Sequence, residues 1–181
     1  MPVRNGAEFS TDGVYRYRLW RVWAPGPRLG FIGLNPSTAC AEHDDPTIRK
    51  CVGFAKRLGF GGIEVCNLFA LRSRWPRALG EAADPVGPDN DSFLSKMSVR
   101  VAACVACWGN HGGLWGRDAI VEALMRSRRI QLKCLAVTAK GKPGHPLMLP
   151  YSAELTDFPG KQGCVGPGRT RGLSRVYNRN S

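Results

Sequence analysis

Acidic residues are scarce in this sequence: 14 Asp and Glu stand against 26 Lys and Arg in 181 residues, for a formal net charge of +12. Arginine supplies 19 of the 26 basic residues. Because the guanidinium group presents a planar fork of donors that matches phosphate oxygens, this imbalance favours a polyanionic partner. We therefore expect the protein to bind nucleic acid, with DNA favoured over RNA, or a nucleotide.

Long hydrophobic runs are also missing. Arg or Lys interrupts every apolar stretch, so no segment reaches the roughly 20 apolar residues of a membrane-spanning helix. Residues 1–6 lack the apolar core of a signal peptide. We expect a cytoplasmic protein with no membrane partner, and the sequence gives no indication of its oligomeric state.

The sequence has neither a second Cys/His pair with zinc-like spacing nor the Gly-rich loop of a Walker-type nucleotide site. Cys104 and Cys107 are spaced like metal ligands, but on a strand this spacing directs the two side chains to opposite faces. We favour two buried thiols. The seven cysteines, an odd number, also do not resemble a secreted disulfide framework. We expect no metal and no cofactor.

The chain divides into a body and a tail. We expect a single α/β domain over residues 9–157 and a basic tail over residues 158–181. The tail holds five basic residues and no acid, which is typical of a disordered arm or of a solvated extension that keeps the protein soluble. Without those five charges the body still carries +7.

Short apolar runs bounded by turn formers predict buried strands, while residues 14–23 alternate Arg with apolar residues as a half-buried edge strand does. Asp45 is the expected cap of a helix that starts at Pro46. Strands that alternate with helices predict βαβ units, a mostly parallel sheet and helices on both faces. The predicted strands are 29–34, 63–66, 102–108 and 132–137. The predicted helices are 46–58, a second that starts near residues 88–91 and runs to about 100, and a third over about 114–127 with Ile120, Val121, Leu124 and Met125 inward.

Each of the four predicted strands from residue 29 onward is followed by a polar, Gly-rich or Pro-rich loop. These loops contain, in order, Asn35, Asn67, Trp108 and His145. Because the carboxyl ends of parallel strands share one edge of a sheet, the loops are expected to meet in a ligand site. The simpler alternative is that Asn and Gly make good turns. In that case Asn35 forms an Asx turn before Pro36, and His145 ties its loop to the backbone.

The sequence closely resembles the family known as domain of unknown function 1643 (DUF1643). The resemblance extends over roughly residues 9–157 and brings no established activity. Its motifs lie in residues 31–39, 44–49, 67–70, 84–87, 108–109 and 145–147.

A more distant resemblance is to the uracil-DNA glycosylase superfamily. Its members carry, in order, an Asp-Pro or Asn-Pro motif, an Asn that ends a middle strand, a Trp-Gly and a His-Pro loop. Here the same order is Asn35-Pro36, Asn67, Trp108-Gly109 and His145-Pro146. The resemblance implies a three-layer α/β/α sandwich with a mostly parallel central sheet, and hydrolysis of an N-glycosidic bond without a metal.

The resemblance also implies roles for individual residues. His145 would donate a hydrogen bond to the departing base anion, and Asn35 would orient the attacking water. Asn67 could read a base edge, with Phe69 or Phe31 stacking on the base. Phosphate contacts are assigned to Ser37, Thr38, Arg49, Lys140 and Lys142, and orienting acids to Asp44 and Asp45, one of which is expected to cap the helix.

Two departures from that superfamily bear on activity. Asn35 stands where the most active members have Asp, so a strong general base is absent there and turnover is expected to be slow or narrow. His145-Pro146 continues as Leu147-Met148 where many members have Ser-Pro. Residues 147–149 could wedge into the space of a flipped base, although packing on the sheet is slightly favoured. The alternative function is a non-catalytic module that binds nucleic acid or a nucleotide.

Overall fold

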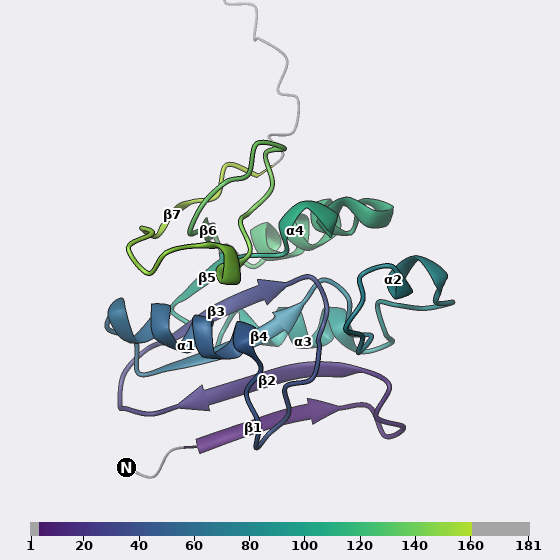
Figure 1. The fold of residues 1–181 in the computed structure, drawn as a ribbon, viewed down its shortest axis with the longest axis horizontal. Helices are drawn as coiled ribbons and strands as arrows, with labels where there is room; N and C mark the ends of the chain where they lie inside the picture. The colour runs from purple at the N-terminus through teal and green to yellow at the C-terminus, as the bar shows by residue number, and fades with distance from the viewer. Residues whose placement is uncertain (1–3, 161–181) are drawn as a thin grey trace, which may run out of the picture.

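A seven-stranded mixed sheet organises residues 4–160, the part of the chain that the computed structural model describes (Figure 1). Its spatial order is β1-β2-β4-β3-β5-β6-β7. The strands are β1 (Arg4–Phe9), β2 (Arg16–Val22), β3 (Arg28–Gly33), β4 (Gly62–Asn67), β5 (Ala103–Ala106), β6 (Leu132–Cys134) and β7 (Thr156–Asp157).

The central strands β4, β3, β5 and β6 are parallel, whereas β1, β2 and β7 are added antiparallel. The prediction of a mostly parallel sheet is therefore wrong, although the α/β class is confirmed. The physical reason is that the segment between β1 and β2 is too short for the crossover that parallel strands require. The predicted edge strand at residues 14–23 is also wrong, because β1 covers its outer side and β2 lies inside the sheet.

The helix predicted from Asp45 and Pro46 is confirmed as α1 (Pro46–Arg57). The Asp45 carboxylate accepts a hydrogen bond from the Ile48 backbone N–H at 2.9 Å, which satisfies one free donor of the first turn. The remaining helical segments are α2 (Ala78–Glu81), α3 (Asn90–Met97), the 3-10 helix η1 (Gly109–Gly116), α4 (Arg117–Ser127) and the 3-10 helix η2 (Pro146–Met148).

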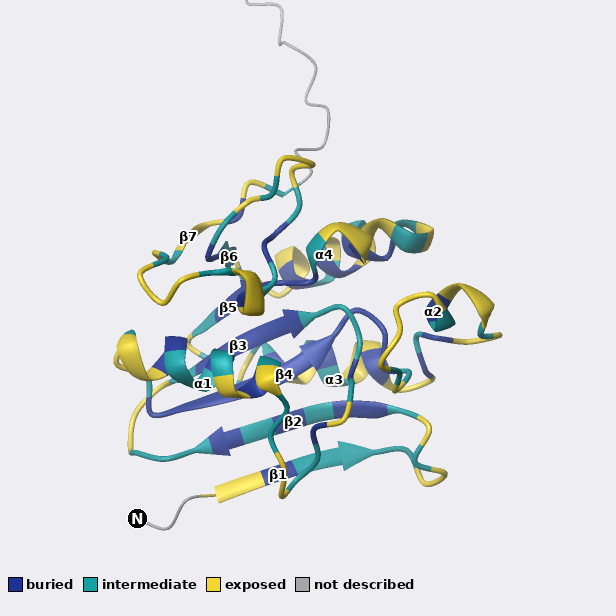
Figure 2. Ribbon diagram, in the orientation of Figure 1, coloured by how far each residue is buried: buried dark blue, intermediate teal, exposed yellow. Residues whose placement is uncertain are grey.

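Helices cover both faces of the sheet, and the central strands β3, β4 and β5 are the most buried of its strands (Figures 1 and 2). Phe31 packs with α1 on one face, and Ile32 packs with α3 and α4 on the other, because successive strand residues point to opposite sides. In α4, Val121 and Met125 are buried as predicted, but Ile120 is 52% exposed. The inward stripe of α4 is thus narrower than predicted.

Cys104 and Cys107 are both buried, and they belong to the two different hydrophobic clusters. This arrangement confirms the interpretation of the pair as buried thiols on opposite faces. Among residues 4–160, no group of three or more His, Cys, Asp or Glu side chains is arranged to hold a metal ion. No helix in the same range is long and apolar enough to cross a membrane.

The domain extends slightly beyond both predicted limits. Its sheet already begins at Arg4, and Phe158 is buried and packs edge-on against Trp108 with ring centroids 5.8 Å apart. Phe158 thus belongs to the core and not to the tail. Residues 161–181, which make up most of the predicted basic tail, lie outside the described residues.

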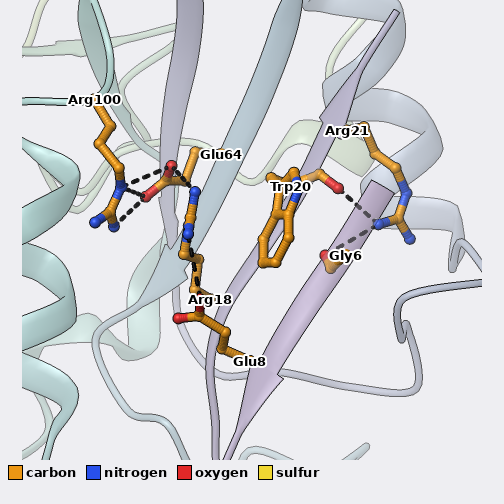
Figure 3. Close-up of polar contacts among 7 residues, drawn as sticks. All are labelled: Gly6, Glu8, Arg18, Trp20, Arg21, Glu64 and Arg100. Atoms are coloured by element: carbon orange, nitrogen blue, oxygen red, sulfur yellow. Dashed lines mark hydrogen bonds and ion pairs between the residues drawn. The ribbon is translucent and has the colours of Figure 1, made fainter. Parts of the chain in front are cut away.

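A fully buried acid, Glu64 in β4, links three parts of the α3 face of the sheet (Figure 3). Arg100, which follows α3, donates from Nη2 to Glu64 Oε1 at 2.6 Å and from Nε at 2.9 Å. Arg18 of β2 donates to Glu64 Oε2 at 3.0 Å and lies over the Trp20 ring. A buried carboxylate is tolerated only with such partners, so Glu64 ties α3 and β2 to the centre of the sheet.

Replacing Glu64 by Gln is expected to lower the free energy of unfolding by about 3 kcal/mol, because both guanidinium groups then lose their buried counter-charge. Urea denaturation followed by circular dichroism measures this loss. The matched control is Glu8→Gln: Glu8 contacts the same Arg18 at 3.4 Å, but its side chain is 43% exposed. We expect the control to change stability by less than about 1 kcal/mol. Equal losses in the two variants would contradict the role of Glu64.

Candidate functional site

A cavity of about 430 Å³ opens at the carboxyl edge of β3, β4 and β5, on the face covered by α1. The size is that of a small-molecule site. All four predicted loops contribute to its wall, so the topology brings together segments that are far apart in the sequence. Its polar lining comes from Arg16, Asn35, Ser37, Asp45, Thr47, Asn67, Ser73, Asn110, His111 and His145, and its apolar lining includes Phe31, Ile48, Val65, Trp108 and Leu147.

Asn35 lies in the loop that follows β3, and both hydrogen bonds of its side chain are donated by Nδ2. They go to the backbone oxygens of Ser73, at 2.8 Å, and Pro36, at 3.1 Å. The amide thus fastens the β3 loop to the β4 loop, and Oδ1 accepts no hydrogen bond within residues 4–160. An Asp at this position could not donate to the two carbonyls. This explains locally why Asn stands here and not Asp.

Asn67 ends β4 and is only 4% exposed. Its Oδ1 is buried without a hydrogen-bond partner in the described part of the chain. The side-chain amide lies close against β3, since a Cβ on Gly33 would come within 2.8 Å of Asn67 Nδ2. An unpaired buried carbonyl costs roughly 1–3 kcal/mol, and it is a ready acceptor for a ligand that enters the cavity.

His145 precedes η2 and lines the opposite part of the cavity. Its Nδ1 accepts from the Leu147 backbone N–H at 3.3 Å. A neutral ring that accepts at Nδ1 carries its proton on Nε2, so His145 offers a hydrogen-bond donor. Burial lowers the pKa of His145 below its ordinary value of 6.5, and the Asp45 charge opposes this shift without cancelling it. The ring is therefore a neutral donor at pH 7.

The two neighbouring acids have different roles. Asp44 pairs with the buried Arg21, at 2.7 Å from Nη2 and 2.9 Å from Nε, and is not part of the cavity wall. Asp45 caps α1 and lines the cavity, so it is the carboxylate that a ligand would meet there. One acid caps the helix as predicted, and the other anchors the loop on β2.

Arg16 is the functional residue that sequence periodicity missed. Glu8 pairs with Arg18, and the next residue, Phe9, pairs with Arg16, which makes Tyr17 the extra residue of a β-bulge. In an unbroken alternation, Tyr17 would point to the α1 face, as Leu19 does, and Arg16 would point to the other face. Because of the bulge, Arg16 points to the α1 face instead. No pattern in residues 14–23 marks this change, since it depends on how β2 pairs with β1.

Several predicted site residues lie outside the cavity. Phe69 is fully buried in the α3 face, edge-on to Trp115, so it cannot stack on a ligand at the α1 face. Lys142 forms an ion pair with Asp118, whose side chain is buried, and this pairing uses its charge. Arg49 is exposed and donates to the Asp44 backbone oxygen, Lys140 is exposed, and Thr38 lies in the neighbouring shallow hollow with Arg72 and Arg74. Of the predicted phosphate contacts, only Ser37 lines the cavity.

Trp108, which follows β5 in one of the four predicted loops, also lines the cavity. It is 2% exposed, and its Nε1 is buried without a partner among residues 4–160. Gly112 is required beside it, because a Cβ there would come within 2.0 Å of the indole ring. The indole packs edge-on against Phe158 in the cluster of the α3 and α4 face, so Phe31 is an aromatic side chain of the α1 face that borders the cavity.

Comparison with known proteins identifies the family of the chain. The model of the family described as "Protein of unknown function (DUF1643)" matches residues 16–147. This range holds the cavity residues from Arg16 to Leu147. No curated protein and no solved structure matches the chain.

The environment of His145 predicts a proton on Nε2 and a titration midpoint below 6.5 in the folded protein. Nitrogen-15 NMR of the imidazole rings measures both. Asp45→Asn keeps a good helix cap but removes the negative charge that favours the imidazolium, so the midpoint of His145 should fall further. A midpoint that rises in Asp45→Asn would contradict this account.

The same shift has a consequence for stability. Because the pKa of His145 is lower in the folded than in the unfolded chain, the unfolded chain binds more protons as the pH falls through 6.5. Stability is therefore lost toward acid pH. The control is His145→Asn, which can still accept from the Leu147 N–H but does not titrate. Relative to this variant, the wild type should lose free energy of unfolding between about pH 7 and pH 5.

Proposed function

The chain belongs to the family described as Protein of unknown function (DUF1643), and from the cavity that this family's residues enclose we propose that it binds a nucleobase and hydrolyses its N-glycosidic bond. The observation that carries the proposal is the convergence of Asn35, Asn67 and His145 on one cavity. The three come from different loops, and they offer the water acceptor, base acceptor and donor that this reaction needs.

Base recognition is assigned to the buried end of the cavity. Asn67 Oδ1 would accept from an N–H of the base edge, which relieves its unpaired state. Phe31 supplies apolar surface for a face of the base. A base that lacks an N–H toward Asn67 would leave the buried carbonyl unsatisfied, so this contact provides selectivity.

In the proposed reaction, water adds to C1′ of the sugar while the bond from C1′ to the base nitrogen breaks. The bonding electrons leave with the base, and His145 Nε2–H donates a hydrogen bond to the oxygen where the negative charge accumulates. Asn35 Oδ1 accepts from the attacking water and orients it. The water leaves its hydroxyl on the sugar and its proton on the base, so no other reactant is needed.

The proposed fold is the three-layer α/β/α sandwich of the uracil-DNA glycosylase superfamily. Helices on both faces of a sheet whose central strands are parallel support that proposal. A second candidate function is binding without turnover. It is favoured by the fact that Asn35 is no general base and spends both of its side-chain hydrogen bonds on the loops.

Free-base release tests the proposal. Purified protein is incubated with oligonucleotides, nucleosides and nucleotides that carry normal and modified bases, and released bases are quantified by chromatography. Asn35→Ala and His145→Ala should each reduce release, the latter by about 100-fold or more, as expected for the loss of a donor to a developing anion. Thr38→Ala, in the same loop but outside the cavity, serves as control. Salt-dependent DNA binding without release would favour the binding module instead.

The lip of the cavity also supports a nucleic-acid substrate. Leu147 lines the cavity and is 44% exposed, and Met148 beside it is 81% exposed, whereas Leu149 packs on the core. We assign Met148 the role of filling the space that a flipped base leaves.

If Met148 has this role, Met148→Ala should weaken binding to duplex DNA several-fold without changing the affinity for a free nucleoside, measured by fluorescence anisotropy and calorimetry. The matched control is Val99→Ala, a similarly exposed apolar position (86%) that follows α3 and does not line the cavity. A loss of nucleoside affinity in Met148→Ala would contradict the wedge.

A further inference from the structure

We propose that Arg16 forms an oxyanion-binding subsite at the β2 end of the cavity, which takes a phosphate group of the ligand. The subsite rests on the proposed function in one respect, namely that the ligand is nucleotide-like. It adds a requirement that the base-reading residues do not impose: the preferred ligand carries phosphate.

The first observation is that the Arg16 side chain is buried and largely unused. The residue is 3% exposed and lines the cavity. One hydrogen bond is formed within residues 4–160, from Nη1 to the Ala39 backbone oxygen at 2.8 Å. Nε is buried without a partner. A guanidinium group has five N–H donors in a fixed fork, so most of the donor capacity remains for a ligand.

The second observation comes from comparison with the other buried arginines. Arg21 and Arg117 are each 4% exposed, and each contacts a carboxylate, Asp44 and Asp91 respectively. Arg16 has no carboxylate within 4.0 Å among the described residues. A buried charge without a counter-ion is costly, and the cost is recovered when an anion binds. The fold pairs its structural arginines and leaves the cavity arginine unpaired.

The charge on Arg16 persists at neutral pH. Burial lowers the pKa of its guanidinium to about 10, which is still well above 7. The charge of Asp45 raises this pKa, and the charges of Arg72 and Arg21 lower it. Asp45 is not in contact with Arg16, so an anionic group of the ligand would supply the direct counter-charge that the guanidinium lacks.

The sheet order positions the subsite relative to the base. Arg16 is on β2, Asn67 on β4, Phe31 on β3 and His145 beyond β6, so the cavity extends along the sheet from Arg16 to His145. Asn67 ends β4, the neighbour of β2, so a nucleotide can place its base at Asn67 while its phosphate group reaches Arg16. That phosphate can belong to a free nucleotide or to a nucleic-acid strand, and both present the same oxygens to the guanidinium fork.

The first test uses the intact protein and inorganic phosphate. The Arg16 Nε–H resonance is followed by proton–nitrogen NMR during a phosphate titration at constant ionic strength, with chloride as the balancing anion. We expect a saturable shift with phosphate and none with chloride. An Nε–H signal that does not respond to phosphate, or responds equally to chloride, overturns the subsite. This measurement depends on no variant.

Thermal unfolding of variants gives the second test. Phosphate should raise the wild-type Tm saturably, and Arg16→Gln should abolish that rise, while Arg16→Lys keeps part of it because the charge remains. The matched control is Arg49→Gln, which removes an exposed arginine of α1. The Tm of this variant should respond to phosphate like that of the wild type. Equal phosphate effects in Arg16→Gln and the wild type would refute the proposal.

A third test identifies the source of the phosphate by comparing ligand affinities. Wild-type protein should bind nucleoside 5′-monophosphates at least tenfold more tightly than the nucleosides, and Arg16→Gln should lose the difference. If a single-stranded oligonucleotide without a terminal phosphate shows the gain in affinity instead, the group is a strand phosphate. No gain in affinity from either ligand overturns the proposal.

The subsite and the proposed hydrolysis can fail separately. Base release that needs no phosphate, with unchanged rates in Arg16→Gln, overturns the subsite alone. Phosphate binding without any base release overturns the glycosidase alone.

Discussion

Parallel pairing of β3 with both β4 and β5 fixes the positions of the site loops and of the helices around them. Three strands that run in the same direction end at the same edge, so the loops after them must lie side by side. Each return between these strands must also cross a face of the sheet, which places α1 on one side and α3 on the other. The cavity lies where these loops meet the start of α1. Asn35, Asn67 and Trp108 line one space for this topological reason alone.

The buried charges of the fold follow a consistent rule with one exception. Glu64 forms ion pairs with two arginines, Arg21 forms one with Asp44, and Lys142 forms one with Asp118. Each of these pairs joins elements that are distant in the sequence, so the charges specify the arrangement of the fold as well as neutralising one another. Arg16 departs from the rule, and it lines the cavity. The carbonyl of Asn67, which is buried and unpaired within residues 4–160, lines the same cavity, and unpaired groups in a cavity wall are candidate ligand contacts.

The cavity wall contains few charged side chains. His145 is neutral at pH 7 because burial disfavours the imidazolium, and Asn35 fastens two loops as well as lining the cavity. Positive charge comes from Arg16 and negative charge from Asp45, and the two are not in contact. Such a site can bind a polar, partly anionic ligand strongly, while any chemistry depends on hydrogen bonds and positioning.

Neighbouring residues were enough to predict the α/β class, the helix that begins at Pro46 after Asp45, and the convergence of Asn35, Asn67 and His145, because periodicity, capping and strand-end loops are local features. Which strand lies at the edge, where Phe69 and Lys142 point, and the entry of Arg16 into the cavity depend on contacts between distant parts of the chain. Phe69 follows a strand end, where the twofold alternation no longer fixes the face, and Lys142 is drawn to an acid 24 residues away. Arg16 depends on a bulge created by pairing with β1. The physical reason is common to all three: these side chains are positioned by partners that are distant in the sequence, and no local pattern contains them.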